Sequence, residues 1–215
     1  MLRIFVFTFL FFIFQTSYCS DSFPKHWWKS PINEMEVIPS WEILPEKGEV
    51  GKSVILSKRN ELGILSNFAA TPFVYEGKKY ASIEGVWQSM KYPEGKWDNR
   101  YGKDKLPFSR EQVEQMVGFE AKKAGSLASE LMKKHQINYV TFAGQRMIYK
   151  TQEKGIHYQL IKNLMKEKLA QNKEVQRILV STDKLILLPD HHSDSTFLPP
   201  AWQYNEIWME LRSQL

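Results

Sequence analysis

The strongest constraint on the fold is a change of hydrophobic period within residues 63–92. The short apolar pieces at residues 64–65 and 73–75 are expected to be extended, and residues 76–77, a glutamate followed by a glycine, are typical of a tight turn. Residues 78–80 then return as the second strand of a hairpin. The sequence therefore predicts a β-hairpin that leads directly into a different kind of element.

That element is a short helix. Ser82 is a suitable N-cap, and the apolar residues after it recur with the i, i+3, i+4, i+7 spacing of one buried helical face. These residues are Ile83, Val86, Trp87 and Met90. Glu84 lies in the first turn, where the helix dipole favours an ionised carboxylate. Glu84 is therefore the first candidate for a functional residue.

The rest of the chain is mainly helical. Periodicity and capping signals predict helices at residues 109–117, 119–135, 155–171, 173–180 and 205–213. Strands are predicted at residues 53–57 and 184–188. Residues 137–149 have partial strand character, and their structure stays open. The pattern predicts an α+β protein: a single, mainly helical domain with a few short strands.

The N-terminus has the composition of a secretory signal peptide. Arg3 supplies a small positive region, and residues 4–14 are apolar apart from one threonine. The apolar run is shorter than the roughly 20 residues of a membrane span, and an uncleaved anchor is the alternative. We expect a signal peptide at residues 1–19, an irregular arm at 20–52 and one domain at 53–215. The mature protein would be secreted or periplasmic, with no membrane span.

Composition limits the classes of partner. Cys19 is the only cysteine and lies in the expected cleavage region, so the mature protein would have neither thiol nor disulfide. Lipid modification of Cys19 is an alternative that the bulky Tyr18 disfavours. The formal charge of +5 comes from interleaved lysines and glutamates, which indicates a mild preference for anions. We expect a monomer with no specific nucleic-acid partner.

The predicted arm is rich in proline and tryptophan. Its tryptophans are Trp27, Trp28 and Trp41. They are expected to anchor the arm by packing against the domain, and stacking on a ligand is the alternative.

An ordered set of motifs resembles the NADAR family. The set consists of Leu65-Ser66-Asn67-Phe68, Pro72-Phe73, Glu76-Gly77 before Tyr80, Ser82-Ile83-Glu84, Gln88 and Lys91-Tyr92. That family includes YbiA-like N-glycosidases of riboflavin-biosynthesis intermediates and enzymes that act on ADP-ribose or its adducts. The resemblance implies hydrolysis of an N-glycosidic bond, no cofactor, and a nucleotide-like small molecule or an ADP-ribosylated target as partner.

The chemistry of such a reaction selects the candidate site residues. Cleavage of the bond between ribose C1 and nitrogen builds positive charge on the sugar, so a carboxylate is needed to balance the charge or to activate water. Glu84 is the expected catalytic carboxylate, and the alternative is an ordinary solvated glutamate. Gln88 and Lys91 follow it at i+4 and i+7, with Lys91 placed to bind a phosphate. Asn67, beside Phe68, either binds the substrate or closes an Asx turn. We expect Asn67, Phe68, Gln88 and Lys91 to contact the substrate.

The C-terminal part departs from the family pattern. Asp194 falls on the family's aspartate and is the second catalytic candidate, but His191 and His192 stand where the family has aromatic residues. A carboxylate often seen after the strand at 184–188 is replaced by leucine. The histidine that usually follows the helix-opening glutamate is Gly85.

These departures leave two main interpretations. In the first, the protein is a hydrolase with Glu84 central, Asp194 in support, and His191 or His192 stacking on the substrate or donating a proton. In the second, it is a secreted, non-catalytic module that binds nucleotide-like ligands. An RNA-contacting domain is a third alternative. A metal site is not expected, because adjacent histidines point apart and only Asp190 and Asp194 lie near them in the sequence.

Overall fold

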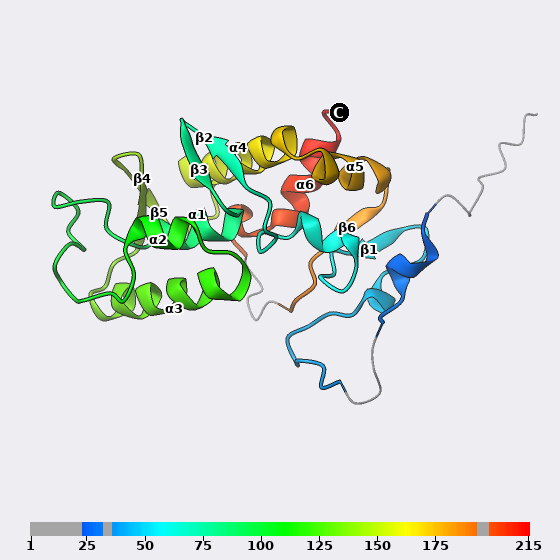
Figure 1. The fold of residues 1–215 in the computed structure, drawn as a ribbon, viewed down its shortest axis with the longest axis horizontal. Helices are drawn as coiled ribbons and strands as arrows, with labels where there is room; N and C mark the ends of the chain where they lie inside the picture. The colour runs from blue at the N-terminus through cyan, green and yellow to red at the C-terminus, as the bar shows by residue number, and fades with distance from the viewer. Residues whose placement is uncertain (1–22, 32–35, 193–197) are drawn as a thin grey trace, which may run out of the picture.

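The computed structural model describes residues 23–31, 36–192 and 198–215 (Figure 1). Its helices are α1 (Ile83–Ser89), α2 (Arg110–Glu114), α3 (Gly118–Lys134), α4 (Ile156–Gln171), α5 (Lys173–Ser181) and α6 (Tyr204–Arg212). Its strands are β1 (Ser53–Ile55), β2 (Phe73–Tyr75), β3 (Lys78–Tyr80), β4 (Tyr139–Phe142), β5 (Gln145–Ile148) and β6 (Ile186–Leu188). Short 3₁₀ helices span Lys25–Trp28, Pro45–Lys47, Glu61–Leu65 and Pro200–Trp202. The predicted mainly helical α+β fold is confirmed.

The strands pair two by two within the described part of the chain. β1 and β6 are parallel, with Ser53 opposite Ile186, and β2–β3 and β4–β5 are antiparallel hairpins. Glu76 and Gly77 join β2 to β3 with positive φ angles of 50° and 78°, as the favoured two-residue hairpin turn requires. The predicted hairpin at residues 73–80 is therefore confirmed.

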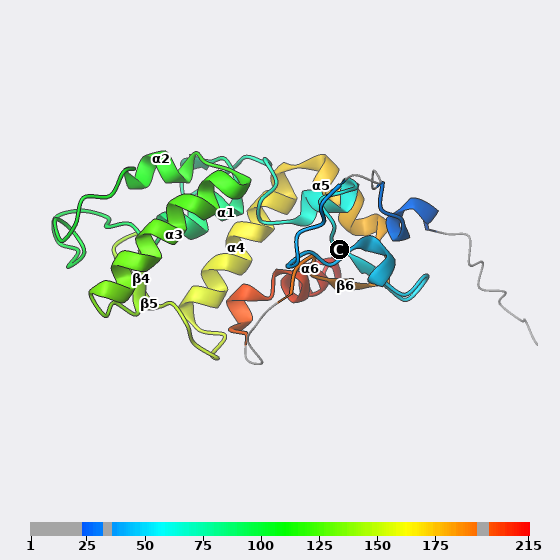
Figure 2. The ribbon, with the colours of Figure 1, turned by 90° about the horizontal axis from the view of Figure 1, so that it is seen from below.

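Helix α1 lies between α3 and α4 (Figures 1 and 2). Ser82 caps it, because the Ser82 Oγ accepts a hydrogen bond of 2.9 Å from the Gly85 N–H. The four apolar residues predicted to form its buried face are all buried, the last of them at the C-cap position. A Cβ on Gly85 would lie 2.6 Å from the Met116 carbonyl oxygen, and one on Gly125 of α3 would lie 1.6 Å from Gln88 Oε1. Both glycines therefore let neighbouring segments approach α1 closely.

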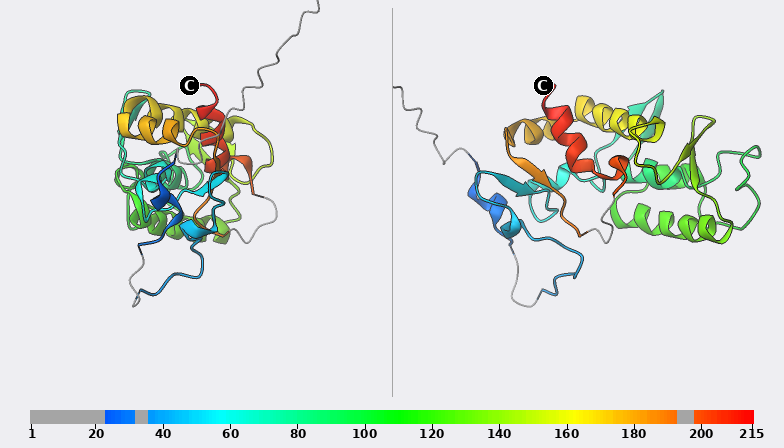
Figure 3. Two further views of the ribbon diagram at one scale, coloured as in Figure 1. Left: turned by 90° about the vertical axis from the view of Figure 1, so that its right-hand side faces the viewer. Right: turned by 180° about the vertical axis from the view of Figure 1, so that it is seen from behind.

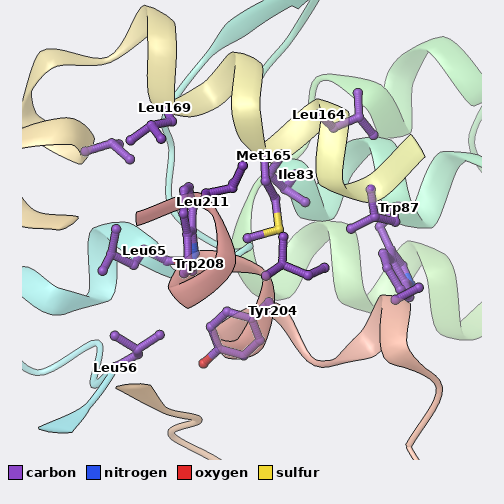
Figure 4. Packing of buried hydrophobic residues seen from close by; sticks show 14 of the residues in the cluster. Leu56, Leu65, Ile83, Trp87, Leu164, Met165, Leu169, Tyr204, Trp208 and Leu211 are labelled. Atoms are coloured by element: carbon purple, nitrogen blue, oxygen red, sulfur yellow. The ribbon is translucent and has the colours of Figure 1, made fainter. Parts of the chain in front are cut away.

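A hydrophobic core joins α4 and α6 and reaches α1 (Figure 4). Its buried side chains include Ile83, Leu164, Met165, Leu169, Trp208 and Leu211. The Trp208 Nε1 donates a hydrogen bond of 2.6 Å to the Leu65 carbonyl oxygen, and the Lys168 Nζ donates one of 2.9 Å to the Ser66 carbonyl oxygen. Helices α6 and α4 thereby hold the loop that carries Asn67.

One segment was predicted incorrectly from the sequence, and another had been left unassigned. Residues 64–65 were expected to be extended but end a 3₁₀ helix, because the Asn60 Oδ1 accepts a hydrogen bond of 3.0 Å from a backbone N–H of its first turn. Residues 137–149, whose structure had stayed open, contain the β4–β5 hairpin. Ala143 and Gly144 form its turn with positive φ angles of 48° and 77°.

The N-terminal arm packs beside β1 and β6 (Figure 3). Trp27 and Trp28 are buried, as packing anchors should be, whereas Trp41 is 41% exposed. The predicted signal peptide lies outside the described residues, and the boundary between arm and domain stays a prediction. Every helix in the described ranges is either too short or too polar to span a lipid bilayer.

Candidate functional site

One large cavity brings the predicted site residues together. It has a volume of about 1010 Å³ and is lined by residues of α1, α3, the β4–β5 hairpin and the loop after β6. Seven of the eight candidate residues line it: Asn67, Phe68, Glu84, Gln88, Lys91, His191 and His192. The eighth, Asp194, lies outside the described residues.

Glu84 is only 5% exposed and yet borders the cavity. Its Oε1 accepts a hydrogen bond of 2.6 Å from the Gln88 Nε2, and its backbone N–H donates one of 2.9 Å to the Asn67 carbonyl oxygen. Burial raises the pKa of the Glu84 carboxyl, and the Gln88 hydrogen bond and nearby lysines oppose only part of this increase. The helix N-terminus was expected to favour the ionised form, whereas burial in the complete fold acts in the opposite direction. The group is more basic than an exposed glutamate, which suits proton uptake.

Asn67 presents a buried acceptor to this site. Within the described part of the chain, the Asn67 Oδ1 has no hydrogen-bond partner. The Asx-turn alternative is not supported, because the Ala69 N–H, which such a turn would use, donates to the Ser66 carbonyl oxygen at 3.3 Å. A buried polar atom without a partner costs about 1–3 kcal/mol. The Asn67 Oδ1 is therefore an unused acceptor in a residue that lines the cavity.

Lys91 is held against α3. Its Nζ donates a hydrogen bond of 2.9 Å to the Ser129 Oγ and lies 3.5 Å from the Gly125 carbonyl oxygen. The same atom lies 5.2 Å from the centre of the Tyr149 ring. Burial, assisted by the charge of Lys122, lowers the pKa of Lys91 to about 8. Lys91 thus lines the cavity as a deep, easily deprotonated amine, and its role as a phosphate ligand stays a prediction.

Asp190, two residues after β6, is a buried carboxylate of the cavity that was not predicted as a site residue. It accepts hydrogen bonds from the Lys58 Nζ, from the His191 Nδ1 at 3.0 Å and from the Tyr204 hydroxyl at 3.5 Å. Burial acts to raise the pKa of Asp190, but His191 and Lys58 outweigh it and hold this pKa below its usual value. Asp190 and Glu84 are therefore two carboxyl groups of one cavity whose pKa values shift in opposite directions, a common arrangement in acid–base sites.

The sequence held one signal that Asp190 is a site residue: its position just after the predicted strand at 184–188. Leucine was expected to replace the carboxylate after the strand at 184–188, and this interpretation overlooked Asp190 immediately beyond that strand.

His191 is oriented by its neighbours. Its ring is parallel to that of Tyr204, with an interplanar angle of 4° and 6.2 Å between ring centres. Because the Nδ1 is bonded to Asp190, the Nε2 is the nitrogen left to exchange a proton with a ligand. His192 is exposed, and its backbone N–H donates a hydrogen bond of 3.0 Å to the Trp41 carbonyl oxygen. No group of three His, Cys, Asp or Glu residues in the described ranges is arranged to hold a metal ion.

Aromatic rings line the cavity in two groups. The first is Trp87, Tyr149 and Trp202, in which the Trp87 Nε1 donates a hydrogen bond of 3.1 Å to the Tyr149 hydroxyl. The second is Trp41, Phe68 and Phe119. Of these six residues, only Phe68 was predicted as a site residue. Such rings are typical of pockets that hold small organic ligands.

One solved structure has a similar fold, whereas no family model and no curated sequence resembles the chain. Among solved structures, the fold is similar to the NMR structure of the E. coli protein YbiA, with a TM-score of 0.48 and 18% sequence identity over 82% of this chain and 92% of that chain. At this level the similarity identifies neither an activity nor a ligand.

Proposed function

We propose that this protein is a hydrolase that cleaves the N-glycosidic bond of a phosphoribosyl-amine or an ADP-ribose-like compound. The observation that carries the proposal is Glu84, a buried carboxyl with a raised pKa on the wall of a cavity of about 1010 Å³. This volume suits a nucleotide-sized ligand. The motif resemblance of residues 65–92 supports the choice of reaction.

The residues of the cavity suggest how the reaction proceeds. Water attacks the anomeric carbon of the sugar while the carbon–nitrogen bond breaks, and the bonding electron pair leaves with the nitrogen. Glu84 balances the positive charge on the sugar and accepts a proton from the attacking water. The Nε2 of protonated His191, whose ring Asp190 orients, donates a proton to the departing nitrogen. The Asn67 Oδ1 accepts a hydrogen bond from a sugar hydroxyl.

The second candidate function is binding without turnover. The observation that favours it is a set of five lysines on the cavity wall: Lys58, Lys91, Lys122, Lys133 and Lys150. These side chains would attract an anionic, nucleotide-like ligand whether or not a bond is cleaved. A secreted module that only captures such a ligand would use the same cavity.

Product release separates the two functions. Purified protein is incubated with ADP-ribosylated and phosphoribosylated amines, and the free amine and the sugar phosphate are measured by chromatography. We expect turnover by the wild type, a loss of at least about 100-fold in Glu84→Gln, and an unchanged rate in the control Glu120→Gln, which alters an exposed carboxylate of α3. Binding without product release would select the second function, and full activity in Glu84→Gln would refute the role of Glu84.

A further inference from the structure

Trp41 belongs to the N-terminal arm, outside the predicted domain at residues 53–215, and yet its ring lines the cavity. The ring centre of Trp41 lies 6.0 Å from that of Phe119, which packs edge-on against Phe68 at 5.1 Å. Trp41 and Phe119 are nevertheless 41% and 60% exposed. Packing within the chain therefore leaves a large part of both rings uncovered, and a ligand that covered them would gain hydrophobic free energy.

The backbone on both sides of Trp41 is held in place. The Trp41 carbonyl oxygen accepts a hydrogen bond of 3.0 Å from the His192 N–H, and the Ile43 N–H donates one of 2.8 Å to the Asp190 carbonyl oxygen. The arm is thus joined to the segment that carries the cavity carboxylate.

An ion pair strengthens this attachment. The Arg59 guanidinium donates two hydrogen bonds, of 2.7 and 2.8 Å, to the carboxylate of Glu42, the residue after Trp41. Two parallel bonds of this kind fix orientation as well as distance. Trp41 is therefore presented to the cavity from a well-defined position.

Lys58 adds a positive charge to these rings. Its Nζ lies 5.0 Å from the centre of the Phe68 ring and 6.0 Å from that of the Trp41 ring. It also pairs with Asp190. A planar group lying on Trp41 would thus meet a cation close by, which favours a planar ring that carries an anionic substituent.

We propose that the N-terminal arm is part of the ligand-binding site, with Trp41 as a specificity-determining residue that stacks on the planar heteroaromatic ring of a nucleotide-like ligand. Lys58 then pairs with an anionic group of the same ligand. This inference takes only the class of ligand from the proposed function. It does not depend on the reaction, since stacking requires no bond cleavage.

Isothermal titration calorimetry with two probes tests this proposal. AMP carries a heteroaromatic ring and a phosphate, whereas ribose 5-phosphate lacks the ring. Loss of one base–aromatic stacking contact weakens affinity by about 5- to 150-fold. We expect Trp41→Ala to weaken AMP binding by this factor and to leave ribose 5-phosphate binding unchanged. Trp41→Phe, which keeps a ring, should retain most of the affinity for AMP.

Trp97→Ala is the matched control, because Trp97 is 49% exposed and does not line the cavity. It should leave the binding of both probes unchanged. The proposal is overturned if the wild type does not bind AMP, if Trp41→Ala binds AMP normally, or if it loses both probes equally. The same data distinguish a failure of the proposed function from a failure of this proposal. Ring-dependent AMP binding without any product release would refute the hydrolase and leave the role of Trp41 intact.

Discussion

Replacing Lys168 by methionine should change how the stability of this protein depends on pH. The Lys168 side chain has no exposed surface. Its Nζ donates a hydrogen bond to the Ser66 carbonyl oxygen and lies 5.7 Å from the centre of the Trp208 ring. An amine in these surroundings loses its hydration without gaining a carboxylate in exchange.

The magnitude follows from the pKa of Lys168. Burial lowers this pKa from 10.5 to about 7. Between these two values the unfolded chain binds more protons than the folded protein, so the free energy of unfolding increases with pH. The penalty for burying the charged amine is complete below pH 7 and decreases as the pH rises. From these pKa values, Lys168 alone should increase the free energy of unfolding by about 2.7 kcal/mol between pH 6 and pH 9.

Urea unfolding at several pH values measures this contribution. Lys91 and other groups also titrate, so the relevant quantity is the difference between wild type and Lys168→Met at each pH. That difference should move in favour of the wild type by about 2.7 kcal/mol from pH 6 to pH 9. Lys166→Met, which removes an exposed lysine from the same helix, should show no such change. A difference that does not vary with pH would refute the burial of Lys168.

Two other variants test the surroundings of the cavity. Gly125→Ala places a Cβ where Gln88 Oε1 now lies, so it should displace the amide that donates to Glu84. We expect at least tenfold weaker activity and a reduced thermal stability, because overpacking a buried side chain costs about 1–3 kcal/mol and the preference of a helix for alanine over glycine offsets only about 1 kcal/mol. Full activity would contradict the close packing. Burial lowers the pKa of His157 from 6.5 to about 4, so the unfolded chain binds more protons between these values. Relative to His157→Phe in urea unfolding, the wild type should lose about 3 kcal/mol from pH 7 to pH 4, and an identical acid dependence of the two proteins would show that His157 is accessible.

Local signals explain what was predicted correctly from the sequence. The hairpin before α1 follows from a turn-forming dipeptide between two short arms, and α1 follows from Ser82 and the apolar spacing behind it. The capping signal before residues 110–117 is a capping box, because the Ser109 Oγ accepts the Gln112 N–H while the Gln112 Oε1 accepts the Ser109 N–H, at 3.2 and 2.7 Å. Each of these features depends on residues within one or two turns of chain.

Long-range contacts explain what was missed. Asp190 reaches the cavity through the pairing of β6 with β1. Trp41, for which stacking on a ligand was only the alternative, reaches the cavity through the hydrogen bond between the arm and His192. Neither contact has a periodic signal in the sequence. The β4–β5 hairpin was left open because Ala143 occupies a position with positive φ, where glycine or asparagine is the usual indicator of a turn.

The raised pKa of Glu84 could not be predicted from the sequence either. The position in the first turn of α1 suggests stabilisation of the carboxylate, whereas the complete fold buries the group within the cavity wall. Desolvation outweighs a terminal dipole in such a position.

The proposed reaction depends on the raised pKa of the Glu84 carboxyl group. An NMR titration that follows the carboxyl carbon of Glu84 measures this pKa directly. The Glu84 signal is assigned by its absence from the spectrum of Glu84→Gln and is followed as a function of pH in the protein without ligand. A midpoint clearly above the ordinary glutamate value of 4.5 is the predicted result. A midpoint at or below that value would contradict the buried, basic carboxyl on which the proposed reaction depends.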